Sequence, residues 1–132
     1  TRLPFHLAIA CPEGYEPDPE IFRRGVAEAA GGIHLHREPA EAVEGADVVY
    51  TDVWASMGQE SEREERLRVF RPYQVSESLM RRAKEDALVM HCLPAHRGEE
   101  IAPEVLDGRQ SVVIDQAENR LHVQKAILEL LL

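Results

Sequence analysis

The sequence lacks the features that mark membrane-spanning and secreted proteins. No apolar run approaches the roughly 20 residues that a membrane helix needs, and the chain opens Thr1-Arg2-Leu3-Pro4 rather than with a signal peptide. It has only two cysteines, Cys11 and Cys92, which are too few for a disulfide framework and form no C-x-x-C pair. We therefore expect a cytoplasmic protein in a reducing compartment, with no membrane partner and no metal.

Common cofactor and hydrolase motifs are also missing. No G-x-G-x-x-G follows a strand-like run, and the sequence has no Walker loop, H-E-x-x-H or G-x-S-x-G. The net charge of −9, from 15 basic and 24 acidic residues, argues against a nucleic-acid partner. These observations exclude the common nucleotide-binding and hydrolase classes, and we expect no cofactor.

The composition that remains is ordinary for one soluble globular domain. The 132 residues are 44% hydrophobic and 30% charged, which is enough apolar material for a single core. The chain does not begin with Met, so we expect residues 1–132 to be one domain of a longer protein.

Short apolar runs alternate with amphipathic segments along the whole chain. The pattern predicts strands at 6–11, 33–36, 46–53, 87–90 and 111–114, and helices at 20–30, 39–44, 60–69, 76–86 and from about 116. Such alternation is typical of an α/β fold, here a doubly wound parallel sheet of about five strands with helices on both faces, Rossmann-like but without a dinucleotide fingerprint. Sites in these folds lie at the carboxyl ends of the strands.

Asp52 leaves the most strand-like segment of the chain, and Ser56-Met57-Gly58 follows at the start of a predicted helix. A carboxylate suits an ammonium group, and free backbone N–H groups at a helix start suit a carboxylate. Together they match the two charges of an amino acid. The residues equally allow Asp52 to be a turn residue and Ser56 a helix cap.

His91-Cys92-Leu93-Pro94 ends the fourth predicted strand. A thiol beside histidine could be a nucleophile or a soft metal ligand, but a buried cysteine is more often a small hydrophobe. Arg120 falls near the start of the last predicted helix, where its charge opposes the helix dipole. A bound anion, a carbonyl or a buried carboxylate would each explain its position.

Three of these segments occur together, in order and at matching distances: the run 52–58, the run 91–94 and Glu118-Asn119-Arg120. As a set they resemble the C-terminal domain of the ornithine carbamoyltransferase family. The resemblance extends from the Cys-Pro-Glu-Gly-Tyr stretch at 11–15 to the helix at 117–127. It implies transfer of a carbamoyl group from carbamoyl phosphate to the δ-amine of L-ornithine, giving L-citrulline and phosphate, as in arginine biosynthesis.

The resemblance assigns roles around the amino-acid head group to four residues. Asp52 matches the residue that binds the ornithine α-amino group. Ser56 and Met57 match those that hold the amino-acid head, and Gly58 matches the glycine that permits the loop.

It assigns roles around the reacting atoms as well. Cys92 is implied to face the ornithine side-chain amine, and the Leu93 carbonyl to contact the carbamoyl group. His91 and Pro94 are implied to be structural, with a cis Leu93–Pro94 peptide turning that carbonyl into the cleft. Arg120 is implied to reach the carbonyl of carbamoyl phosphate, where it would stabilise the oxyanion.

The family's N-terminal domain has no counterpart in this sequence. Its Ser-x-Arg-Thr and His-Pro-x-Gln segments, which bind carbamoyl phosphate, are absent. We therefore expect this chain alone to be inactive and to need that domain, and the resemblance implies a homotrimer as the full protein. The tail at 126–132 is apolar on nearly every side, so we expect the last helix to pack against a second domain.

Other functions stay open at this level. The acceptor could be putrescine, N-acetylornithine or another amine, although Asp52 with the 56–58 loop favours a free α-amino acid. The His-Cys-Leu-Pro segment disfavours an aspartate carbamoyltransferase, because the corresponding segment of that family resembles His-Pro-Leu-Pro. The domain could instead be a non-catalytic amino-acid binding module, or a thiol hydrolase that uses Cys92 with His91 or His96.

Overall fold

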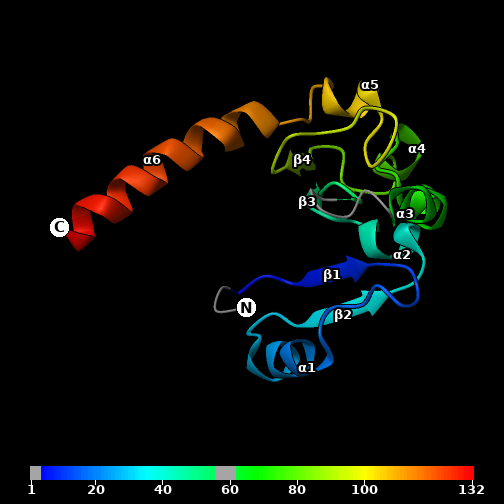
Figure 1. The fold of residues 1–132 in the computed structure, drawn as a ribbon, viewed down its shortest axis with the longest axis horizontal. Coiled ribbons are helices and arrows are strands. Elements are labelled where there is room, and N and C mark those ends of the chain that lie inside the picture. The colour runs from blue at the N-terminus through cyan, green and yellow to red at the C-terminus, as the bar shows by residue number, and fades with distance from the viewer. Residues whose placement is uncertain (1–3, 56–61) are drawn as a thin grey trace.

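The computed structural model describes residues 4–55 and 62–132 (Figure 1). The elements follow in the order β1 Leu7–Ala10, α1 Pro19–Glu28, β2 Ile33–His36, α2 Pro39–Val43, β3 Val48–Thr51, α3 Arg63–Phe70, η2 Arg71–Tyr73, α4 Glu77–Met80, β4 Leu88–His91, α5 Pro103–Leu106 and α6 Val113–Leu131. From β1 to β4 the order of strands and helices follows the predicted alternation, although α4 ends at Met80 rather than near Asp86, and α5 was not predicted.

Local sequence explains where two of the helices begin. At α1 the Asp18 carboxylate accepts hydrogen bonds from the N–H groups of Glu20 and Ile21, each at 3.0 Å, and a proline follows as the first helical residue. At α4 the Ser76 hydroxyl accepts from the Leu79 N–H at 3.3 Å. Both caps satisfy donors that a helix start would otherwise leave unpaired.

The strands pair in parallel, as expected for an α/β fold, but in two separate pairs. β1 lies beside β2, and β3 lies beside β4. The parallel α/β class is therefore confirmed, whereas the predicted single sheet of about five strands is corrected to two two-stranded sheets among the described residues. A hollow of about 360 Å³ lies between the pairs. It is lined by residues of both, such as Ala8 of β1 and Val48 of β3.

The fifth predicted strand is also corrected. The segment 111–114 contributes one bridge, between Val89 and Ser111, with the Val112 N–H donating to the Val89 carbonyl at 3.0 Å. It cannot extend further because α6 begins at Val113, rather than near 116 as predicted.

The buried core gathers around β3 and β4. Its members are apolar side chains from β3, β4, the helices α2, α4 and α5, the start of α6 and the loops between them: Val43, Val49, Val75, Met80, Ala87, Val89, Ile101, Ala102, Val105, Leu106 and Val113. The α1 helix has no buried residue. The buried core of the described residues thus surrounds the two strands whose carboxyl ends lead to Asp52 and Cys92.

The last helix leaves this core. Figure 1 shows α6 projecting away from the strands, with the C-terminus at its far end. Exposed apolar residues run along it: Ile114, Leu121, Val123, Ile127, Leu128, Leu130, Leu131 and Leu132. Among the helices of residues 4–55 and 62–132, none is long and apolar enough to cross a membrane.

Candidate active site

The register of β3 and β4 brings Asp52 and Cys92 together. Thr51 pairs with His91 at the carboxyl end of this parallel pair, so the next residue of each strand leaves the sheet at the same edge. The Cys92 thiol donates to Asp52 Oδ1 at 3.0 Å, and the same oxygen accepts from the Val53 N–H at 2.7 Å. Asp52 is exposed, so a carboxylate faces outward where the sequence predicts an ammonium site.

The surroundings of Cys92 keep its thiol protonated. Burial raises the pKa of Cys92, and the hydrogen bond to Asp52 and the negative charge of Asp52 raise it further. A nucleophilic cysteine needs the opposite shift, usually from a neighbouring imidazole. Neither His91 nitrogen serves that purpose, because Nδ1 accepts from the Leu93 N–H at 2.8 Å and Nε2 lies 3.0 Å from Glu100 Oε1. The geometry therefore does not support a thiol hydrolase that pairs Cys92 with His91.

The backbone after Cys92 has an unusual shape. Leu93 has a positive φ of 57°, and the Leu93–Pro94 peptide is cis, as the resemblance implies. A non-glycine residue in the left-handed region needs surroundings that hold it there. The Leu93 N–H bond to His91 supplies one such restraint.

Asp52 also lies on the wall of the hollow between the strand pairs, together with Trp54 and Arg66. Trp54 stacks on Phe70 of α3 with ring centroids 6.0 Å apart, and Tyr15 meets the same ring edge-on at 4.8 Å. The Arg66 guanidinium donates to the Trp54 carbonyl at 3.3 Å. These contacts anchor the chain that leaves β3 against the helix that follows it.

Two polar residues at the site were not predicted from the sequence. Gln116 of α6 accepts the His91 N–H through Oε1 at 3.1 Å and donates to the Tyr50 hydroxyl at 3.3 Å, which ties α6 to β3 and β4. Glu100 is fully buried beside His91. In the sequence, Glu100 follows Gly98-Glu99 and is indistinguishable from a surface charge.

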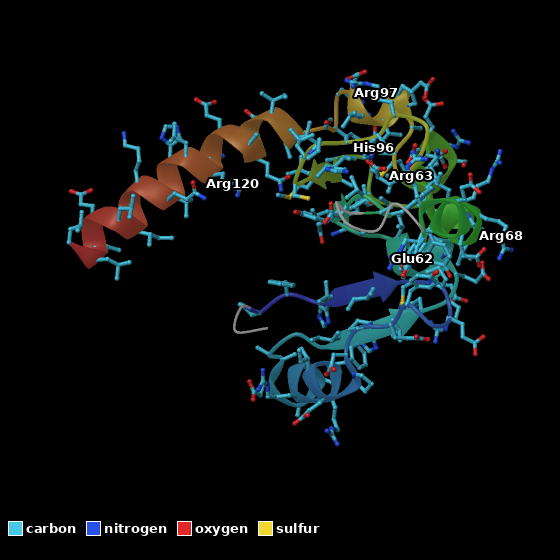
Figure 2. All side chains as sticks on the ribbon, viewed as in Figure 1. Glu62, Arg63, Arg68, His96, Arg97 and Arg120 are labelled. Atoms are coloured by element: carbon cyan, nitrogen blue, oxygen red, sulfur yellow. The ribbon has the colours of Figure 1, made fainter. Side chains whose placement is uncertain are left out.

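Other predicted residues are not gathered at this edge. Ser56, Met57 and Gly58 lie outside the described residues. Arg120 is exposed on α6, and Figure 2 shows it on the projecting helix, apart from the strands. Since α6 begins at Val113, Arg120 lies about 10 Å along the helix rather than in its first turn. The argument from the helix dipole therefore no longer applies to it.

Among the described residues, two groups of side chains have the spacing of metal ligands. One is Asp52, His91 and Cys92, and the other is His96, Glu99 and Glu100. In the first group both His91 nitrogens already have partners. In the second, Glu99 is ion-paired with Arg63. Neither group is therefore assigned a metal.

Comparison with known proteins identifies the family that the chain resembles. Residues 1–131 match the family described as aspartate/ornithine carbamoyltransferase, Asp/Orn binding domain. The ornithine carbamoyltransferase of Syntrophus aciditrophicus is 72% identical over 132 residues, which are all of this chain and 44% of that protein.

Solved structures are similar as well. The ornithine carbamoyltransferase from Pyrococcus furiosus is 55% identical with a TM-score of 0.86, over 94% of this chain and 41% of that one. The anabolic enzyme from Campylobacter jejuni is 37% identical with a TM-score of 0.87, over 97% and 43%. The chain thus spans less than half the length of these relatives.

Proposed function

Because the chain belongs to the aspartate/ornithine carbamoyltransferase family, we propose that it is the ornithine-binding domain of an ornithine carbamoyltransferase. The full protein would transfer the carbamoyl group of carbamoyl phosphate to L-ornithine, giving L-citrulline and phosphate, as in arginine biosynthesis. One observation carries the proposal: Asp52 and Cys92 meet at 3.0 Å at the carboxyl edge of β3 and β4. A carboxylate and a neutral thiol at this edge suit an acceptor with two amino groups better than an acceptor with a side-chain carboxylate, such as aspartate.

The reaction sets a clear demand on this edge. The δ-amine attacks the carbamoyl carbon, the carbon–oxygen bond to phosphate breaks, and the nitrogen loses a proton. A free alkyl ammonium has a pKa of about 10, so the site must favour the neutral amine. Burial and then Asp52 raise the pKa of the Cys92 thiol, which therefore adds no second negative charge beside the δ-amine.

The remaining roles are proposed by matching the motifs of this sequence to those of the family. Asp52 binds the α-ammonium group of ornithine, Ser56 and Met57 hold the amino-acid head, and Gly58 permits the loop. The Leu93 carbonyl contacts the carbamoyl group, with His91 and Pro94 shaping that turn. Arg120 stabilises the developing oxyanion. Its exposed position on α6 supports a site that is complete only when α6 packs against another domain.

The partners of this domain are part of the proposal. An N-terminal domain would bind carbamoyl phosphate, and the full protein would be a cytoplasmic homotrimer without a cofactor. The reduced state of Cys11 and Cys92 is compatible with that compartment. The exposed apolar residues of α6 supply a surface for the second domain.

The test is a citrulline assay on the full-length protein with carbamoyl phosphate and a panel of acceptors. L-ornithine should be the preferred acceptor, ahead of putrescine, N-acetylornithine and L-aspartate. Preference for another amine would change the acceptor assignment. Ornithine binding without turnover of any acceptor would instead favour a non-catalytic amino-acid binding protein.

A further inference from the structure

His91 and Glu100 form a buried polar pair next to the proposed site. Their exposed fractions are 1% and 0%, and His91 Nε2 lies 3.0 Å from Glu100 Oε1. The same oxygen accepts the His96 N–H at 2.6 Å. One oxygen of Glu100, which lies just before α5, thus contacts both His91 at the end of β4 and the backbone of His96 in the loop that follows.

The proton positions in this pair follow from the backbone. The Leu93 N–H can only donate, and it points at His91 Nδ1 from 2.8 Å. Nδ1 must therefore carry a lone pair, which places the ring proton on Nε2, facing Glu100. Glu100 accepts that proton in a hydrogen bond, so it selects the one neutral form of His91 that can accept from Leu93.

We propose that Glu100 is a positioning residue for the carbamoyl transfer, acting through His91 on the backbone of Leu93. The inference rests on the proposed function. The hydrogen bond between His91 and the Leu93 N–H restrains Leu93 at a φ of 57°. Leu93 directly follows Cys92 and carries the carbonyl proposed to contact the carbamoyl group. Without an acceptor at Glu100, the ring proton can move to Nδ1, and the restraint on Leu93 is lost.

A purely structural role explains Glu100 less well. Its second oxygen, Oε2, is buried and has no hydrogen-bond partner among the described residues, with His96 Nδ1 3.8 Å away. Burying a carboxylate with an unpaired oxygen is unfavourable, and an apolar side chain would fill the space at lower cost. The carboxylate is therefore better explained by the hydrogen bond that it offers His91.

The experiment compares Glu100→Gln and Glu100→Leu in the full-length protein. Glutamine keeps Oε1, and the His96 N–H requires an acceptor there, so the side-chain oxygen stays toward His91. Leucine removes the acceptor. The matched control is Glu104→Leu, at an exposed position of α5. The kinetic readouts are kcat and KM for each substrate. The ring tautomer is read from ¹⁵N spectra of labelled histidine, and the His91→Gln variant identifies which signal belongs to His91.

Glu100→Leu should lower kcat by about 10- to 100-fold, the scale expected for misplaced reacting groups, and should lose the Nε2–H signal of His91. Glu100→Gln should retain most of kcat and the Nε2–H signal, and Glu104→Leu should behave as wild type. Normal kcat in Glu100→Leu would overturn the proposal, and so would loss of kcat in Glu100→Gln with the tautomer intact.

The two proposals can fail separately. If Glu100→Leu does not fold, the kcat and tautomer of Glu100→Gln still decide, because that variant keeps the shape and the acceptor. An Nδ1–H signal from His91 in the wild type would overturn the positioning role even in an active enzyme. A well-folded wild type that makes no citrulline would overturn the proposed function instead.

Discussion

Asp52 presents its carboxylate at the edge of the sheet, with Oδ1 engaged by Cys92 and Val53. Replacing it by asparagine keeps the shape and removes the charge proposed to face the α-ammonium group. In the full-length protein, Asp52→Asn should weaken ornithine binding by about 1–3 kcal/mol and leave carbamoyl phosphate binding nearly unchanged, as measured by calorimetry.

The matched control for that variant is Asp47→Asn, an exposed aspartate just before the same strand. It should leave both affinities unchanged. Equal weakening of both substrates by Asp52→Asn would mean that Asp52 supports the fold rather than the substrate.

Cys92 provides a second prediction at the scale of one residue. Burial and Asp52 raise the pKa of its thiol, and only the thiolate reacts with iodoacetamide. Alkylation of Cys92 should therefore begin at a higher pH than for a free cysteine. In Asp52→Asn the negative charge is gone, so the pKa should fall and alkylation at a fixed alkaline pH should be faster.

Mass spectrometry resolves Cys92 from Cys11, whose pKa is also raised by burial. Because the Cys11 environment does not include Asp52, its rate should not change in the variant. Rapid alkylation of Cys92 at neutral pH would contradict the geometry at this edge.

At the scale of elements, α6 differs from the others because its apolar side chains have little to pack against. Leu128 and Leu131 are 59% and 77% exposed. Residues 1–132 expressed alone should therefore self-associate, and the double variant Leu128→Lys, Leu131→Lys should shift the chain toward monomer in sedimentation velocity. The control is His122→Lys, exposed on the same helix, which should not change the distribution. A monodisperse wild-type monomer would sink the idea that α6 is a docking surface.

At the scale of the whole molecule, the proposed function predicts that the site in this chain is completed by another domain. The residues with proposed roles serve the acceptor or the carbonyl oxygen, and the segments expected to bind the phosphate group are absent from the sequence. Residues 1–132 should therefore make no citrulline from ornithine and carbamoyl phosphate, whereas restoring the upstream domain should produce it. Circular dichroism of the short chain controls for folding. Turnover by the short chain would contradict the two-domain site.

Local sequence by itself determined the alternation of elements, the caps at Asp18 and Ser76, and the segments that hold Asp52 and Cys92. Such features depend on hydrophobic periodicity and on residues a few positions apart, so one chain reveals them. The strand-end rule predicted Asp52, Cys92 and Arg120 at one rim. The structure confirms this for Asp52 and Cys92, whereas Arg120 lies apart on α6 (Figure 2). The family resemblance, not periodicity, led to the cis Leu93–Pro94 peptide.

Only the tertiary structure decided the rest, because it depends on contacts between distant residues. Ser111 makes a single bridge since Val113 already starts α6, and that start moves Arg120 away from the first turn. Gln116 reaches across to Tyr50, 66 positions earlier in the chain. Glu100 and the exposed Glu104 cannot be told apart in the sequence. Only the packing around β4 buries Glu100 against His91, where it can accept the hydrogen bond of the ring.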